Sequence, residues 1–188
     1  MLGRIQQRRT RRKLAASHYE AIVEQSREPA FYAHLGVPDT MLGRYEMVCL
    51  HAYLVLTRLK RESEECAQVA QTLHDLIFDD FDVALREAGL GDMGIGHRIK
   101  KLARNLHGRI SVYESGLAAG DSALDEILRR NLYASAEPEP AQVAGMIAYL
   151  RAARGLIDEV SASALLEGRS SFPDSTAFVG RSAEVIAP

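Results

Sequence analysis

Residues 64–88, EECAQVAQTLHDLIFDDFDVALREA, decide the fold class, because apolar side chains recur along them at steps of three and four. This period places the apolar side chains on one face of an α-helix. The side chains of this predicted core face are Cys66, Ala70, Leu73, Ile77, Phe81, Ala84 and Ala88. Asp75, Asp79, Asp82 and Arg86 recur at the same steps on the opposite face. The stretch therefore predicts an amphipathic helix that packs onto a larger core and exposes an acidic stripe.

The same helical period continues on both sides of this stretch, and no run shows the alternation of a β-strand. Residues 47–56 are apolar almost all the way round, which is typical of a central helix. The other expected helices cover about 8–26, a short turn from Pro29, 40–61, 92–117, 121–133 and 143–160. We therefore predict an all-α, single-domain bundle of about six or seven helices. Its expected divisions are a basic N-terminal helical arm (1–28), a helical domain (29–166) and a loose, flexible tail (167–188).

Length and composition fit one soluble domain. The 188 residues are 47% hydrophobic and 26% charged, which is enough apolar material for a single core. A formal net charge of -2 argues against a dedicated nucleic-acid binder, so no DNA partner is expected. The apolar run 47–56 is far shorter than the roughly 20 residues that a membrane-spanning helix needs. Cys49 and Cys66 lie in apolar helical patterns and not in a metal or disulfide framework, which favours the cytoplasm.

The start of the chain is strongly basic, since its first thirteen residues include no acidic side chain. The side chains expected to form a docking arm are Arg8, Arg9, Arg11, Arg12 and Lys13. Such an asymmetry suits contact with RNA, with a ribosome or with anionic lipid. The alternative interpretation is a solvated basic start of a helix.

Motifs that resemble catalytic or ligand sites fail in their structural context. The glycine pattern of residues 89–94 resembles a dinucleotide fingerprint, but that motif works only between a strand and a helix. Asp75, Asp79 and Asp82 share a face on which carboxylates can hold Mg²⁺, as in all-helical prenyl-transfer enzymes. Val83 stands where that aspartate-rich motif needs a further aspartate, and no second acidic cluster follows. A Mg²⁺-dependent enzyme stays an alternative; the leading interpretation is a non-enzyme without catalytic residues, cofactor or metal.

Four polar side chains fall on or beside faces that are expected to be buried. The six histidines form no ligand pair of the kind that binds zinc or iron on helices. His51 and His74 each interrupt an apolar face, which indicates either a satisfied buried histidine or a contact with a partner. Arg98 and Arg109 lie at the edge of the predicted 92–117 seam, so one or both are expected to be partly buried and paired with a carboxylate.

A series of short motifs runs between about residues 30 and 160. Its members are Leu50-His51-Ala52-Tyr53, Arg58-Leu59-Lys60-Arg61, His74-Asp75, Phe78-Asp79-Asp80-Phe81-Asp82, Leu85-Arg86-Glu87, Gly91-Asp92-Met93-Gly94-Ile95-Gly96, Ile99-Lys100-Lys101, Gly108-Arg109, Tyr113 and Arg130-Asn131-Leu132-Tyr133. In order and spacing, this series resembles the ubiquinol-cytochrome c chaperone family, the assembly factors for cytochrome b of ubiquinol-cytochrome c reductase.

The resemblance implies a non-catalytic, all-helical chaperone that binds newly made cytochrome b and keeps it competent for haem insertion and assembly. In mitochondrial members a small partner protein and the ribosome exit region also take part; the lack of a long presequence here is typical of a bacterial member. We expect a cytoplasmic protein, free or peripheral at the cytoplasmic face of the inner membrane. Such a client exposes apolar helices and positively charged loops, so an apolar groove with an acidic rim suits it. Tyr53, Phe78 and Phe81 are expected to line the groove, or else to belong to the core, and Asp75, Asp79 and Asp82 are expected to meet the loops. The residues expected to form this partner-binding surface are His51, Tyr53, His74, Asp75, Phe78, Asp79, Phe81, Asp82 and Arg86.

Overall fold

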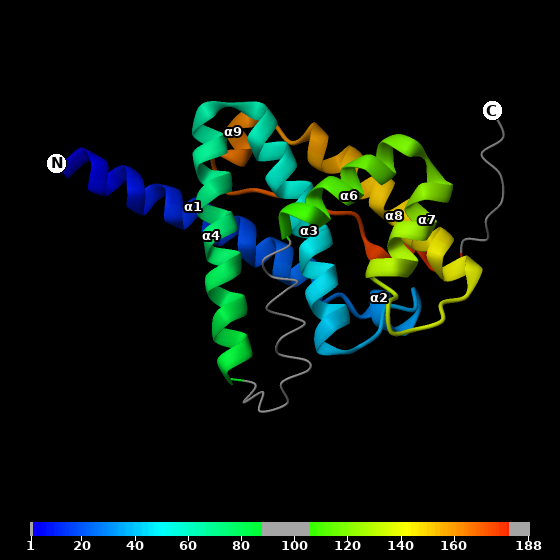
Figure 1. The fold of residues 1–188 in the computed structure, drawn as a ribbon. Coiled ribbons are helices and arrows are strands. Elements are labelled where there is room, and N and C mark those ends of the chain that lie inside the picture. Colours follow the sequence, from blue (N-terminus) through cyan, green and yellow to red (C-terminus); the bar gives the residue numbers. More distant parts are fainter. Residues whose placement is uncertain (1, 88–105, 181–188) are drawn as a thin grey trace.

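The computed structural model describes residues 2–87 and 106–180, which form helices and loops without a strand (Figure 1). In chain order the elements are α1 (Leu2–Ser26), α2 (Pro29–Ala33), α3 (Met41–Glu62), α4 (Glu64–Glu87), α6 (Leu106–Ala119), α7 (Asp121–Asn131), α8 (Pro140–Glu159), α9 (Ala162–Leu165) and a 3-10 helix, η1 (Ser175–Phe178). The predicted all-α, single-domain fold is confirmed. The helix expected over 92–117 lies within the described residues only from Leu106 onward.

The helix starts follow local sequence signals. Thr40 precedes α3, and its hydroxyl accepts a hydrogen bond of 3.1 Å from the backbone N–H of Gly43. At the start of α8, Glu139 and Gln142 form a capping box, and Pro140 occupies the first turn. Gly120 separates α6 from α7 with φ of 109°, a conformation that favours glycine. These signals set the lengths of the helices that surround the core.

Helix α3 is the centre of the bundle, as its apolar sequence predicts. It contacts α1, α4, α6 and α8, and every residue from Cys49 to Leu56 is buried. Its first turn lies so close to the preceding loop that a Cβ atom on Gly43 would stand 2.0 Å from the carbonyl oxygen of Pro38. The middle of the central helix is therefore covered on all sides, and its first turn packs tightly against the preceding loop.

A buried ion pair joins α3 to the second half of the bundle. Arg109 of α6 donates to Glu46 of α3 over 2.6 Å and also to the side-chain oxygen of Asn131. Glu46 is 1% exposed, and burial raises the pKa of its carboxyl to about 7, although Arg109 acts in the opposite direction. The prediction that Arg109 is partly buried beside a carboxylate is confirmed; Arg98 lies outside the described residues.

The segment after α8 packs onto the core, which extends the packed chain beyond the predicted tail boundary at 167. His18 of α1 lies 3.0 Å from the carbonyl oxygen of Leu165 through Nε2 and 2.8 Å from the Ser170 hydroxyl through Nδ1. The ring centroids of Phe172 and His51 lie 5.0 Å apart, and Phe178 is 6% exposed. The segment is packed through single anchoring side chains, so it has no period to detect. Residues 181–188 lie outside the described residues.

Candidate binding groove

Two of the residues predicted to contact a partner belong to the core, which corrects that prediction. His51 is 0% exposed; its Nδ1 lies 2.8 Å from the carbonyl oxygen of Met47, and its Nε2 lies 2.6 Å from the Tyr149 hydroxyl. In the tautomer that is protonated at Nδ1, this N–H donates to the Met47 carbonyl and Nε2 accepts from the Tyr149 hydroxyl. Burial lowers the pKa of the ring to about 4, so the ring is neutral at pH 7. His51 is therefore a satisfied buried histidine, the first of the two interpretations that its position allowed.

Tyr53 is the second predicted contact residue that lies in the core. Its ring is 0% exposed, and its hydroxyl donates to Glu114 of α6 over 2.7 Å and accepts from Arg154 of α8 over 2.8 Å. Because α3 is apolar all round, its pattern does not reveal that α6 and α8 cover this side. Tyr53 fastens three helices together and does not line a surface groove.

Helix α4 carries the remaining predicted residues, and its outer face is acidic as expected. Asp75 and Asp79 are exposed, and Asp75 accepts a hydrogen bond from Gln71. His74 and Phe78 are half-buried side by side, with ring centroids 4.6 Å apart. Asp82 and Arg86 belong to the same helix, but their side chains lie outside the described part of the structure.

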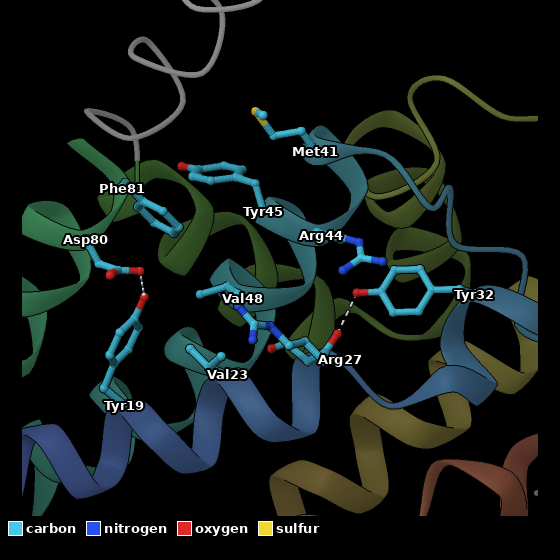
Figure 2. A pocket seen from close by; sticks show the side chains of 11 residues that line it. Tyr19, Val23, Arg27, Tyr32, Met41, Arg44, Tyr45, Val48, Asp80 and Phe81 are labelled. Carbon is cyan, nitrogen blue, oxygen red and sulfur yellow. Dashed lines mark hydrogen bonds between the residues drawn. The ribbon is translucent and has the colours of Figure 1, made fainter. Parts of the chain in front are cut away.

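Phe81 leads into a groove that sequence reasoning alone did not locate. A cavity of 240 Å³ lies where α1, α2, α3 and the second half of α4 meet (Figure 2). The residues that line it, called the groove below, are Tyr19, Val23, Ser26, Arg27, Tyr32, Met41, Arg44, Tyr45, Val48, Asp80 and Phe81. Of Tyr53, Phe78 and Phe81, which were expected to line an apolar groove, only Phe81 does so. This groove lies at a different place from the expected one, and Arg27 and Arg44 line it, whereas the expected rim was acidic.

One end of the groove is closed by contacts between α1, α3 and α4. The Phe81 ring packs on Tyr45 with centroids 4.7 Å apart. Beside this pair, the Tyr19 hydroxyl donates to Asp80 over 2.5 Å (Figure 2). Burial, and after it the bond to Asp80, raise the pKa of Tyr19, so the hydroxyl stays a donor at neutral pH. Asp80 is exposed, and this hydrogen bond joins it to α1 at this end of the groove.

The opposite end is cationic through Arg44, which lies beside Tyr32, and Arg27 extends from this side toward the middle of the groove near Val23 and Val48 (Figure 2). We call Arg27, Arg44 and Tyr32 the cationic corner. The Arg44 guanidinium lies 5.6 Å from the centroid of the Tyr32 ring, and its Nε donates to Asp39 over 2.6 Å. The Tyr32 hydroxyl donates to the carbonyl oxygen of Ser26 over 2.5 Å. Burial raises the pKa of Tyr32 to about 12, with Arg44 and Arg27 both opposing the rise, which places both cations near this hydroxyl.

The basic arm is the first part of α1; its Arg11 faces α4, whereas Arg8, Arg9 and Arg12 point away from the bundle. Gln6, Gln7, Thr10, Arg11 and Leu14 line a hollow together with the start of α4, and Arg11 donates to Gln68 over 2.9 Å. Helical geometry puts Arg8, Arg9 and Arg12 on the other side, where all three are exposed. Ile5 lies on the same side one turn away and is 56% exposed. The arm therefore presents a cationic face with an apolar side chain inside it.

The described residues form neither a cluster suited to a metal ion nor a helix suited to span a membrane. They include no group of three or more His, Cys, Asp or Glu side chains placed to hold a metal ion. Asp75 and Asp79 stand on one exposed face without a second acidic helix opposite them in the described ranges. Over the same residues, no helix has the length and hydropathy to cross a membrane.

Known proteins match the larger part of this chain. A sequence profile described as ubiquinol-cytochrome C chaperone matches residues 33–172, which include α3, α4 and α8. The chain belongs to this family. The resemblance that the motif series indicated is thereby confirmed, and the description of the family is that of a chaperone.

Relatives of this chaperone family come from animals and bacteria. Assembly factor 1 of the ubiquinol-cytochrome c reductase complex from Mus musculus is 22% identical over 82% of this chain and 52% of its own length. The Xenopus laevis protein of the same name is 21% identical over 82% of this chain and 78% of its own. This chain thus spans about half the length of the mouse relative. The crystal structure of the Cbp3 homologue from Brucella abortus is 38% identical, with a TM-score of 0.78, over 94% of this chain and 98% of that one.

Proposed function

We propose that this chaperone holds an apolar segment of newly made cytochrome b in the groove during assembly of ubiquinol-cytochrome c reductase. The observation that carries the proposal is an apolar, aromatic groove on a member of a chaperone family for this enzyme. An unassembled membrane subunit exposes apolar side chains to water, and covering them prevents aggregation. Met41 is 46% exposed at the edge of the groove, so apolar surface is available to such a segment. We place this activity at the cytoplasmic face of the inner membrane.

Deletion of the gene tests the chaperone role, and groove variants test the site. Haem spectra of membranes from deletion cells should show a reduced cytochrome b signal. Complementation with Met41→Glu should fail to restore the signal, because a charge at the edge of the groove opposes entry of an apolar segment. Met41 is in the first turn of α3, where an acidic residue does not disfavour the helix.

Leu156→Glu is the matched control for the groove variant. Leu156 is 38% exposed on α8 and lies outside the groove, so this variant should restore the signal. Circular dichroism of both purified proteins checks that they are folded. An undiminished cytochrome b signal in the deletion cells would refute the chaperone role, and equal behaviour of the two variants would refute the groove as its site.

A second function, docking on an anionic membrane surface, is favoured by the arm. Arg8, Arg9 and Arg12 surround Ile5 on the face turned away from α4, which suits lipid headgroups around one inserted side chain. Each basic residue near an anionic surface contributes about 1 kcal/mol. Arg8→Gln with Arg12→Gln should therefore weaken binding to phosphatidylglycerol vesicles by about 2 kcal/mol, or roughly 30-fold.

Sedimentation with vesicles measures this binding. Lys60→Gln with Arg130→Gln removes the same charge from exposed positions outside the arm, so it should bind as the unmodified protein does. Ile5→Ser should weaken binding to the vesicles. Binding to ribosomes that falls with salt, combined with no binding to the vesicles, would show that the arm docks on RNA instead.

A further inference from the structure

We infer that the groove selects protein segments in which a carboxylate lies within about one helical turn of a large apolar side chain. The inference rests on the proposed function, because it specifies what kind of segment that groove accepts. Its basis is the unequal distribution of charge between the two ends of the groove.

The walls of the groove favour contact with apolar side chains. Val23 and Val48 lie between the two ends, and the hydroxyls of Tyr19 and Tyr32 are already used within the protein (Figure 2). A cavity of about 150 Å³ is enough for benzene, so 240 Å³ has room for one or two large apolar side chains. These walls alone would accept any apolar segment.

The charges add the selectivity. At the end opposite the cationic corner, Asp80 accepts a hydrogen bond from the neutral Tyr19 hydroxyl and keeps its negative charge. At the cationic corner, Arg44 forms an ion pair with Asp39. Arg27 is exposed and forms no ion pair in the described part of the chain. The corner therefore has a surplus of positive charge beside an apolar surface. A carboxylate on the bound segment reduces that surplus, whereas a cation on the segment increases it.

A helical segment brings both features into reach. Side chains three or four residues apart are neighbours on one helical face. With a large apolar side chain seated between Val23 and Val48, a carboxylate one turn away can approach Arg27 and Arg44. Guanidinium groups bind carboxylates through paired N–H donors, which favours this contact over one with a neutral amide.

Three labelled helical peptides test the inference by fluorescence anisotropy. They share one apolar face of Leu and Phe and differ at a single flanking position, which is Glu, Gln or Lys. The Glu peptide should bind about 3-fold more tightly than the Gln peptide, the size expected of one exposed ion pair, and the Lys peptide should bind least. Raising the salt concentration should reduce the differences among them.

Variants locate the preference. Arg27→Glu should reverse the order of the three peptides, because it changes the sign of the charge at the corner. Arg130→Glu, on the exposed side of α7, makes the same charge change outside the groove and should keep the order. Met41→Ser, which removes apolar contact at the edge of the groove without changing its charge, should weaken binding of all three peptides by a similar factor.

The outcomes separate this inference from the chaperone role. Equal affinities of the three peptides, the same order in Arg27→Glu, or no binding of any peptide would each overturn the inference. None of these results depends on cytochrome b levels in cells. Conversely, a normal cytochrome b signal after gene deletion refutes the chaperone role and leaves the measured peptide preference standing.

Discussion

Replacement of the buried carboxylate in Glu46→Gln should change how the stability of this protein depends on pH. Glu46 is 1% exposed in the folded protein, and its pKa rises from 4.5 to about 7, mainly through burial. Between these two pH values the folded state holds a proton that the unfolded chain has released. Stability contributed by this group is therefore full below about pH 4.5 and is lost as the pH rises through about 7.

The size of the effect follows from the two pKa values. One unit of pKa difference corresponds to about 1.4 kcal/mol, and the two titration curves leave about 2.5 kcal/mol to be lost between pH 5 and pH 8. Glutamine at position 46 does not titrate, so the variant lacks this loss. The stability of the natural protein relative to Glu46→Gln should thus fall by about 2.5 kcal/mol between pH 5 and pH 8.

Urea unfolding followed by circular dichroism at the two pH values measures this difference. Other titrating groups, such as the buried His18 and His51, are present in both proteins and cancel in the comparison. A difference that does not change with pH would refute the reasoning. A change of opposite sign would mean that the ion pair with Arg109 outweighs burial and lowers the pKa of Glu46.

Three further predictions concern packing. Gly43→Ala should lower the free energy of unfolding by about 3 kcal/mol, because the new Cβ meets the carbonyl oxygen of Pro38. Gly155→Ala, inside α8 with nothing within 4 Å of the new Cβ, should instead raise the free energy of unfolding by about 0.5 to 1 kcal/mol. Melting temperatures of the two variants that shift in the same direction would contradict this pair of predictions. Phe178→Ala should lower the urea midpoint by an amount equivalent to about 3 kcal/mol, because Phe178 is 6% exposed. A negligible shift would show that the segment after α9 contributes no stability.

Sequence reasoning succeeded where one helix decides the outcome. The acidic face of α4 depends only on the spacing of Asp75 and Asp79, and both are exposed as expected. The buried pairing of Arg109 follows from its place at the edge of an apolar seam, although the partner Glu46 is not evident from the pattern. A period of 3.6 residues fixes which side chains share a face, which is all that these predictions require.

Features that depend on several helices could not be derived in this way. The groove takes Tyr19 from α1, Tyr32 from α2 and Tyr45 from α3, and none of these positions is unusual within its own helix. Tyr53 was misplaced because an all-apolar helix does not indicate which neighbour covers each side. Phe178 anchors a segment outside the long helices, where no repeating pattern exists to find.

Helix α1 is one continuous helix that carries both the basic arm and part of the groove, so it fixes the distance between these two proposed contact sites. The basic arm occupies its first turns, whereas Tyr19, Val23 and the segment leading to Arg27 form a wall of the groove. At 1.5 Å per residue, Arg8 and Val23 are separated by about 22 Å along the axis. A protein anchored through its arm would hold its groove at that fixed distance from the anchoring residues, measured along the axis of α1. Inserting or deleting whole turns of α1 between the two would change the spacing while keeping every side chain on its face.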